Sequence, residues 1–200
     1  ITGGTDITAT LDGSDVAFST PEDFNGSESF TVSVTDGSLD DSQSFTVIVD
    51  PVNDVPIAYS ESAITSEDQS ITIALYADDI DGDYLIFNLI NDAANGSVSI
   101  DGSFATYIPD QDFNGSDNFT FTASDGIISS NIAEIALTIN PVNDALVLEH
   151  IDNVFFNEDT SQSIILFAND VDGDELTYTI SDGENISAII NENEVTFSAL

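Results

Sequence analysis

The stretch Ile135-Ala136-Leu137-Thr138-Ile139 alternates large apolar residues with small or polar ones, and Phe119-Thr120-Phe121-Thr122-Ala123 does the same shortly before it. Successive side chains of a β-strand point to opposite faces of the sheet, so a period of two predicts strands with one buried face. No part of the chain shows a convincing helical period. The sequence therefore predicts an all-β fold.

Five further runs of the same kind precede this pair, and together they predict seven short strands within about 90 residues. The predicted strands lie near residues 57–64, 70–76, 84–90, 96–100, 104–108, 117–124 and 132–140. Turn-forming pairs separate several of them, namely Asp101-Gly102, Asn114-Gly115 and Asp125-Gly126. The pattern is typical of an immunoglobulin-like β-sandwich, although the Cys and Trp of antibody domains are missing.

The chain carries an internal repeat with a period of about 90 residues. Four motif pairs agree on it: residues 23–27 with 112–116, 35–37 with 124–126, 67–68 with 158–159, and 79–83 with 170–174. We expect residues 1–50 to be the C-terminal half of one repeat, 51–140 a complete repeat, and 141–200 the N-terminal half of the next. Half a sandwich would expose sheet edges and an apolar face, so a longer parent chain or neighbouring molecules should supply the missing strands.

The stretch Asp50-Pro51-Val52-Asn53-Asp54-Val55-Pro56 joins the first two of these parts. Proline lacks a backbone N–H and favours an extended residue before it, so two prolines this close predict a stiff connector. Three side chains in the stretch carry oxygen, and Asn140-Pro141-Val142-Asn143-Asp144 repeats the arrangement. Oxygen donors repeated at each joint suggest metal ions that hold the parts in line.

The charge of the chain is extreme, with 38 acidic residues, no Lys, no Arg and a formal net charge of −38. No salt bridge to Lys or Arg can offset the repulsion that folding creates, whereas each bound divalent cation would bring two positive charges. The charge argues against binding of nucleic acid, and against adhesion to an anionic bilayer without a bridging cation. No run of about 18 apolar residues occurs, so membrane insertion is not expected.

The segment Asp79-Ile80-Asp81-Gly82-Asp83 places carboxylates at alternate positions of a predicted loop. A calcium ion takes about six to eight oxygen ligands, which clustered carboxylates can supply. An EF-hand does not fit, because its sixth residue is glycine and its twelfth an acid. Here glycine is fourth, and the twelfth residues of the two copies are Ile90 and Ser181. Any single Asp could be a solvated turn residue, but the recurring set favours metal ligands pooled from separate segments.

Together these motifs resemble the cadherin repeat. The segment Ala77-Asp78-Asp79-Ile80-Asp81-Gly82-Asp83 looks like the Asp-x-Asp segment of cadherins, and residues 50–56 are similar to their inter-domain calcium linker. The run from PVNDVP (51–56) through DDIDGD (78–83) and PDQDFNGSDNFTFTASDG (109–126) to PVND (141–144) resembles the tandem-95 repeats of giant bacterial adhesins. The resemblance implies an array of seven-stranded β-sandwiches, joined by short calcium-binding linkers, in an extracellular or cell-surface protein.

The resemblance also implies the calcium ligands of each joint. For the first joint they are Asp50, Asn53, Asp54, Asp79, Asp81 and Asp125. For the second they are Glu67, Asn140, Asn143, Asp144, Asp170 and Asp172. The predicted set further includes Asp36, Asp68, Asp83, Glu158, Asp159 and Asp174. The Arg-containing acidic motif of animal cadherins is absent; Asp110 or Asp112 could stand in for its acid, but neither belongs to the predicted set.

The two linkers differ in ways that predict unequal joints. The second has Asn140 where the first has Asp50, and Leu146 where the first has Pro56. We therefore expect weaker ion binding at the second joint. Outside the joints, Phe24 and Phe113 are predicted core anchors, and His150 is a predicted surface residue.

The leading hypothesis is a calcium-rigidified spacer of a large extracellular adhesin or surface filament that supports cell adhesion. Its expected partners are neighbouring repeats of the same chain, or identical chains whose half-repeats complete one another into a filament. The alternative is a polysaccharide- or protein-binding module, which exposed Tyr59, Tyr76 and Tyr84 would favour. An enzyme is not expected, because a single His leaves serine chemistry without a base.

Overall fold

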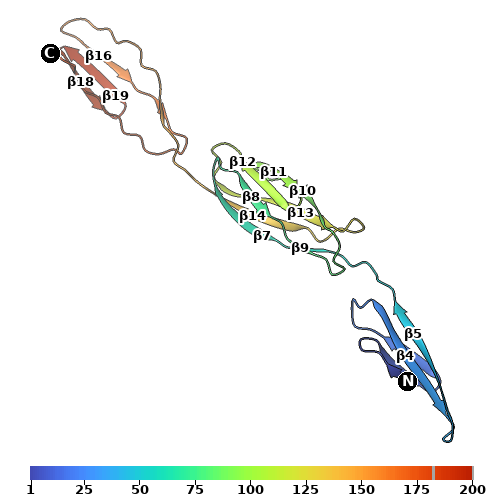
Figure 1. Ribbon diagram of the computed structural model, residues 1–200. Helices are drawn as coiled ribbons and strands as arrows, with labels where there is room; N and C mark the ends of the chain where they lie inside the picture. The colour runs from blue at the N-terminus through green and yellow to red at the C-terminus, as the bar shows by residue number, and fades with distance from the viewer. Residues whose placement is uncertain (182, 200) are drawn as a thin grey trace.

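The protein is described by a computed structural model over residues 1–181 and 183–199. The described residues form strands and loops, which confirms the predicted all-β fold. Figure 1 shows three β-rich parts in a row, with the two termini at opposite ends. We name them the N-terminal unit (1–49), the central unit (57–140) and the C-terminal unit (147–199). None of the described residues belongs to a helix long and apolar enough to cross a membrane.

The central unit is a sandwich of two sheets, with strand orders β10-β13-β14-β7 and β11-β12-β8. A short ladder of β6 and β9 completes it. The strands are β6 Ile57–Ala58, β7 Glu61–Ser66, β8 Ile71–Ala74, β9 Ala77–Asp78, β10 Ile86–Asn91, β11 Gly96–Asp101, β12 Phe104–Pro109, β13 Gly115–Ser124 and β14 Ala133–Asn140. Strand β14 runs parallel to β7, from the pair Ile135 and Glu61 to the pair Asn140 and Ser66.

The core follows the period of two. Along β14 every second residue is buried, and Phe119 and Phe121 of β13 are fully buried beside them. Tyr107 enters the same core from the other sheet. The residues between them on β14 face solvent. Burial of one face of each sheet is therefore what closes the sandwich.

The predicted strand 57–64 is wrong as a single element. It is divided at Tyr59 and Ser60 into β6, which pairs with β9, and β7, which pairs in parallel with β14. The chain thus crosses from one ladder to another inside one apolar run. Apolar alternation marks a buried face but carries no signal for a change of partner, so the sequence pattern missed both the break and β9.

The predicted Asn-Gly turn at Asn114 and Gly115 is also wrong. The turn lies at Gln111 and Asp112, and Gly115 begins strand β13. Phe113 packs against the core as predicted, and its ring lies beside Gly115, which has a φ of 130°. Glycine adopts such a backbone without steric cost. The N-terminal unit repeats this arrangement with Phe24 and Gly26.

The flanking units contain fewer paired strands. In the N-terminal unit, β1 Thr2–Gly3, β4 Gly26–Thr35 and β5 Asp40–Val49 form a sheet, and β2 Thr8–Asp12 pairs with β3 Asp15–Ser19. In the C-terminal unit, β15 Val147–Leu148 pairs with β17 Ala168–Asn169, while β16 Ser161–Ile165, β19 Glu194–Ala199 and β18 Ile186–Asn191 form a sheet.

Both flanking units expose apolar surface that the central unit covers. Val34 of β4 is 70% exposed, whereas its counterpart Ala123 in β13 is fully buried. Residues 152–157 correspond to β7, yet they form no strand within the described residues. In the central unit it is β14 that pairs with β7.

Asp117 secures a loop of the central unit. Its carboxylate accepts hydrogen bonds from the N–H groups of Ala94 and Asn95 at 3.0 and 2.9 Å, and from the Tyr107 hydroxyl at 3.1 Å. Burial would raise the pKa of Asp117, but the backbone N–H groups outweigh it and the pKa lies below its usual value. Glu28 of the N-terminal unit likewise accepts the N–H groups of residues 5–7.

We expect Asp117→Asn to lower the free energy of unfolding by about 1–3 kcal/mol near neutral pH, because hydrogen bonds to a charged acceptor are lost. The folded-state pKa is depressed, so this stability is complete above the unfolded-state pKa and disappears as the pH falls through the folded-state pKa. Urea unfolding at several pH values measures the loss of unfolding free energy and its dependence on pH. Asp101→Asn, a change of an exposed acid, is the control. A loss that stays constant into strong acid would contradict the assignment.

Candidate metal centres

The first joint ties its linker to two loops of the central unit. The N–H of Asp54 donates to Asp81 Oδ2 at 2.8 Å. The side chain of Asn53 donates to Asp125 Oδ2 at 2.8 Å and to the backbone carbonyl of Asp54 at 3.0 Å. Segments separated by 27 and 72 residues in the chain therefore meet at this linker.

The loop of residues 79–83 is closed by hydrogen bonds to the side chain of Asp79, its first residue. Asp79 Oδ1 accepts the N–H groups of Asp81 at 2.9 Å and Asp83 at 3.4 Å. Gly82, with a φ of 77°, lets the backbone turn back, and Gly173 repeats this with 76°. Carboxylate oxygens of Asp79, Asp81 and Asp83 consequently all lie within 4.8 Å of one another.

The second joint has the same linker geometry. The N–H of Asp144 donates to Asp172 Oδ2 at 2.7 Å, and the Asn143 side chain donates to the Asp144 carbonyl at 2.9 Å. The loop that follows also repeats, since Asp170 Oδ1 accepts the N–H of Asp174 at 3.4 Å. The repeated sequence thus gives a repeated joint.

The central unit contributes a buried acid to the second joint. Glu67 is only 3% exposed. Its carboxylate accepts the N–H of Val142 and, at 3.3 Å, the side chain of Asn114, while its own N–H donates to the Asn140 carbonyl at 2.9 Å. The start of the second linker is therefore fixed to the end of the central sandwich.

Two groups of carboxylates meet at the second joint. Oxygens of Glu67, Asp144 and Asp172 lie within 4.8 Å of one another, and so do oxygens of Asp68, Asp112 and Asp144. Asp144 belongs to both groups. The joint therefore brings together acids from the central unit, the linker and the C-terminal unit.

The crowding changes the acidity of the linker carboxyls. Burial, followed by repulsion from Asp112 and other nearby acids, raises the pKa of Asp144. Burial, followed by repulsion from Asp23, does the same to the pKa of Asp54. Asp125 behaves differently: the N–H of Ile128 and the side chain of Asn53 lower its pKa.

These residues fit a bound calcium ion. Asp79 Oδ2 and Asp144 Oδ2 are buried and have no hydrogen-bond partner within the described part of the chain. A buried carboxylate oxygen left unpaired costs free energy, which a bound cation removes. Carboxylate, amide and carbonyl oxygens gathered from several segments are the ligands that calcium accepts. Asp79 and Asp144 are also members of the carboxylate groups above.

The structure brings most of the predicted ligands to the joints. At the first joint these are Asn53, Asp54, Asp79, Asp81, Asp83 and Asp125. At the second they are Glu67, Asp68, Asn140, Asn143, Asp144, Asp170, Asp172 and Asp174. Their role as ligands stays a prediction. Asp50 is exposed and belongs to none of the carboxylate groups found among the described residues.

Three predicted ligands lie away from both joints, which corrects that part of the set. Asp36 lies in the turn before β5, and the ten residues of β5, roughly 30 Å of strand, separate it from the first linker. Glu158 and Asp159 repeat the turn of Glu67 and Asp68, with φ values of 61° and 58° at the two Asp residues. That turn meets the linker that follows its unit, not the linker before it.

The predicted set missed acids that the preceding unit brings to each joint. These are Asp112 at the second joint, and Asp23 with Glu22 at the first. The signal was present, because residues 23–27 and 112–116 repeat. The motif was interpreted as a core anchor beside an Asn-Gly turn, and Asp112 was considered only as a stand-in for the acid of the animal cadherin motif.

The expected weakness of the second joint has no counterpart in the linker geometry. Its two backbone contacts match those of the first joint to within 0.1 Å. The linkers do differ in packing, since Pro56 is fully buried and Leu146 is 57% exposed. A difference in affinity stays a prediction.

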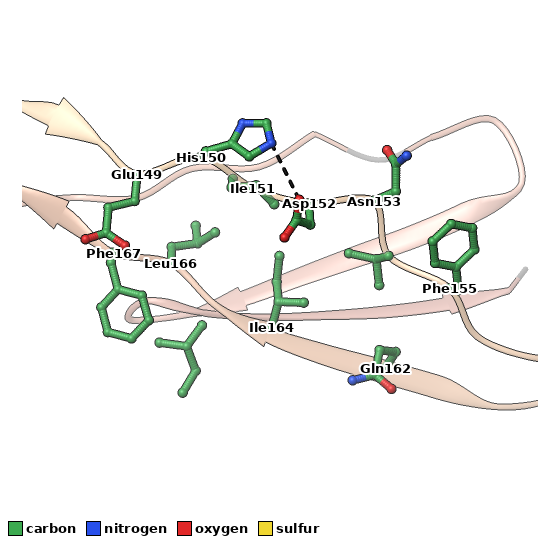
Figure 2. A pocket seen from close by; sticks show the side chains of 12 residues that line it. Glu149, His150, Ile151, Asp152, Asn153, Phe155, Gln162, Ile164, Leu166 and Phe167 are labelled. Carbon is green, nitrogen blue, oxygen red and sulfur yellow. Dashed lines mark ion pairs between the residues drawn. The ribbon is translucent and has the colours of Figure 1, made fainter.

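The C-terminal unit has a hollow of about 450 Å³ between residues 149–155 and strand β16. Figure 2 shows Ile164 and Leu166 in it, with His150 paired to Asp152 at 3.6 Å. The side chain of His150 is 87% exposed, so the predicted surface position is confirmed. The hollow holds none of the joint carboxylates, and its apolar lining corresponds to the core of the central unit.

Comparison with known proteins shows which proteins the central unit is similar to. Residues 53–138 match the family model described as the bacterial Ig domain. No curated protein matches the chain. The matched residues coincide with the central sandwich, so this unit is similar to the bacterial Ig domain and has an immunoglobulin-like fold.

Solved structures support the fold. The protocadherin GammaB4 extracellular domain aligns with a TM-score of 0.54 at 15% identity, over 99% of this chain and 38% of that one. The protocadherin gammaB7 EC3-6 cis-dimer structure aligns with a TM-score of 0.53 at 14% sequence identity. The alignment covers 100% of this chain and 59% of that one. An endo-fucoidan hydrolase of glycoside hydrolase family 107 aligns with a TM-score of only 0.38 at 16% sequence identity. The alignment covers 99% of this chain and 34% of that one. The chain thus spans less than two thirds of each of these structures.

Proposed function

We propose that the chain is a calcium-rigidified spacer within a large extracellular or cell-surface protein that supports adhesion. The observation that carries the proposal is the pair of buried, unpaired oxygens, Asp79 Oδ2 and Asp144 Oδ2, one at each joint. Asp79, Asp81 and Asp83 would hold an ion at the first joint, together with Asn53, Asp54 and Asp125. Glu67, Asp144 and Asp172 would hold one at the second, together with Asn143 and Asp170.

The ions would stiffen the joints by an electrostatic route. With no Lys or Arg in the chain, the carboxylates of each joint repel one another and favour separation of the units. A cation between acids of the linker and of the following unit replaces this repulsion with attraction. We propose no enzymatic activity for the chain.

Calcium removal tests this function. We expect chelator to lower the melting temperature and to broaden the distribution of shapes seen by small-angle X-ray scattering. Extracellular calcium modules bind with a Kd on the order of 10⁻⁴ to 10⁻³ M, so millimolar calcium should reverse both effects. Magnesium at equal ionic strength is the control. Melting and scattering curves that chelator leaves unchanged would contradict the proposal.

A binding module is the second candidate. Tyr84 is 80% exposed, Tyr76 58% and Tyr59 42%. Exposed tyrosines offer flat apolar faces to sugar rings or protein partners. Tyr59 and Tyr76 also meet through a backbone hydrogen bond of 3.0 Å. If no sugar on a glycan array binds the protein, with or without calcium, polysaccharide binding would be contradicted.

Neighbouring repeats are the proposed partners of the flanking units. Repeats of the same chain or of identical chains would cover faces such as that of Val34. Analytical ultracentrifugation of the 200-residue protein distinguishes pairing within one chain from pairing between identical chains. Only pairing between identical chains makes the average molecular mass rise with protein concentration.

A further inference from the structure

We propose that the outer face of the central unit's sheet of β11, β12 and β8 binds an uncharged polysaccharide through Tyr59, Tyr76 and Phe104. We name these three side chains the aromatic strip. The inference rests on the second candidate function, to which it gives a site and a class of ligand. It is independent of calcium binding at the joints.

Neighbouring chain segments bring the three rings of the aromatic strip to one face. Tyr59 directly follows β6 and Tyr76 directly precedes β9, and the register of these two strands places the two tyrosines opposite each other. Phe104 pairs with Ala74, two residues before Tyr76. Residues two apart on a strand share a face, so Phe104 is a diagonal neighbour of Tyr76. Opposite Cβ atoms lie about 4.5–5.5 Å apart and diagonal ones about 7–8 Å, so the rings form a continuous row.

The strip faces solvent, while its neighbours in the chain build the core. Ala58, Leu75 and Ala105 each adjoin a member of the strip and are buried. Phe104 itself is 54% exposed, close to the values of the two tyrosines. The rings therefore contribute little to closing the sandwich.

The C-terminal unit carries acids at two of the three positions. Glu149 takes the place of Tyr59, since its N–H donates to the carbonyl of Phe167 just as that of Tyr59 donates to Tyr76. Glu194 begins β19 and pairs with the last residue of β16, as Phe104 does with the last residue of β8. The same strand pairs thus form with an acid at these positions, so the fold does not require the rings.

The chemistry of the face favours an uncharged sugar. Pyranose rings have flat C–H faces, which pack against aromatic rings, and hydroxyls at their edges. The Tyr59 hydroxyl donates to Asp78 Oδ2 at 3.0 Å, and this exposed carboxylate and the Tyr76 hydroxyl can bond sugar hydroxyls. The chain has no Lys or Arg to hold a carboxylate or sulfate group, and its charge of −38 repels acidic polysaccharides. A cationic ligand would gain from acids, but here rings replace them.

The size of the strip favours a sugar chain over a protein. A buried aromatic side chain covers about 150–250 Å², so three rings that are about half exposed offer roughly 300 Å². Exposed Ile57 on β6 adds to this area, but the sum stays below the roughly 800 Å² that each partner of a stable protein interface buries. Thr72 and Thr106, hydrogen-bonded to each other at 3.3 Å, limit the apolar area beside Phe104.

The test is an array of neutral glucans, mannans and galactans with their sulfated counterparts, followed by calorimetric titration of a neutral hexasaccharide that the protein binds on the array. We expect the 200-residue chain to bind a neutral glycan and not its sulfated form. Tyr76→Ala and Phe104→Glu should each weaken binding at least about tenfold. Phe167→Ala removes the exposed counterpart of Tyr76 and should leave binding unchanged. Urea unfolding of both strip variants should match wild type, because both side chains are exposed.

The possible failures are distinguishable. A wild-type chain that binds no neutral glycan would overturn the inference and the polysaccharide form of the second candidate, while the calcium-rigidified spacer stands. Equal binding of wild type and both strip variants would overturn the strip as the site while polysaccharide binding stands. A molecular mass that rises with concentration in wild type but not in Phe104→Glu would assign the face to a second copy of the chain and overturn the inference.

Discussion

Asp144→Asn is expected to abolish calcium-dependent stiffening of the second joint while the first joint still stiffens. Asp144 is the acid shared by both carboxylate groups, and its Oδ2 is the buried oxygen without a partner. The amide keeps the shape of the side chain but removes the charge that would hold the ion. The linker contact to Asp172 should survive, because it uses the backbone N–H of residue 144.

Each joint can be measured separately. The chain has no Cys, so pairs of introduced cysteines give unique labelling sites. Ser99→Cys with Asn191→Cys spans the second joint, and Ser42→Cys with Ser99→Cys spans the first; all three positions are exposed. Spin-label distance distributions should narrow with calcium at both joints in wild type, and only at the first in Asp144→Asn. Narrowing at the second joint of the variant would contradict the role of Asp144.

The change should also lower stability in calcium. One ion at 100 times its Kd stabilises the folded state by about 2.7 kcal/mol, and each tenfold loss of affinity removes about 1.4 kcal/mol of that. Asp101→Asn is the matched control, because Asp101 is an exposed acid of the hairpin between β11 and β12.

Phe119→Ala should have the largest effect on folding. Phe119 is fully buried in the core cluster, and truncation of a buried Phe costs about 3–5 kcal/mol. The free energy of unfolding of a whole domain is about 5–15 kcal/mol, so the central unit would be close to unfolding. Urea unfolding followed by circular dichroism measures the loss.

The joints should weaken together in this variant, because the central unit supplies acids to both. Ile64→Ala is the control: Ile64 lies on β7 but is 65% exposed, and its truncation should change stability by less than about 0.5 kcal/mol. Equal stability of the two variants would contradict the assigned core.

Local patterns predicted the sandwich well, because each buried strand had to alternate. The buried positions of β14 and the pair Phe119 and Phe121 follow directly from the period of two. What alternation could not give is the partner of each strand. The division of residues 57–66 into β6 and β7 depends on β14 and β9, which lie elsewhere in the chain.

The candidate site was predictable where acids repeat at fixed spacing within one loop or linker. Asp79, Asp81 and Asp144 were found in this way. Asp112 was named only as a stand-in for the cadherin acid and was left out of the predicted set, because its position depends on the backbone of the turn, which has a φ of 56° that no residue type dictates. Asp36 repeats Asp125 in the sequence, but the sequence does not show which end of a strand meets which linker.

The parallel pairing of β7 with β14 has a mechanical consequence. The chain enters the central unit through β6 and β7 and leaves it through β14, so a pull on the two linkers draws these neighbouring strands in opposite directions. The ladder from Ile135 and Glu61 to Asn140 and Ser66 is then loaded in shear, with all its hydrogen bonds sharing the force at once. The contact from Glu67 to Asn140 extends this shear-loaded seam to the linker itself. The central unit is thus built to resist tension along the row of units.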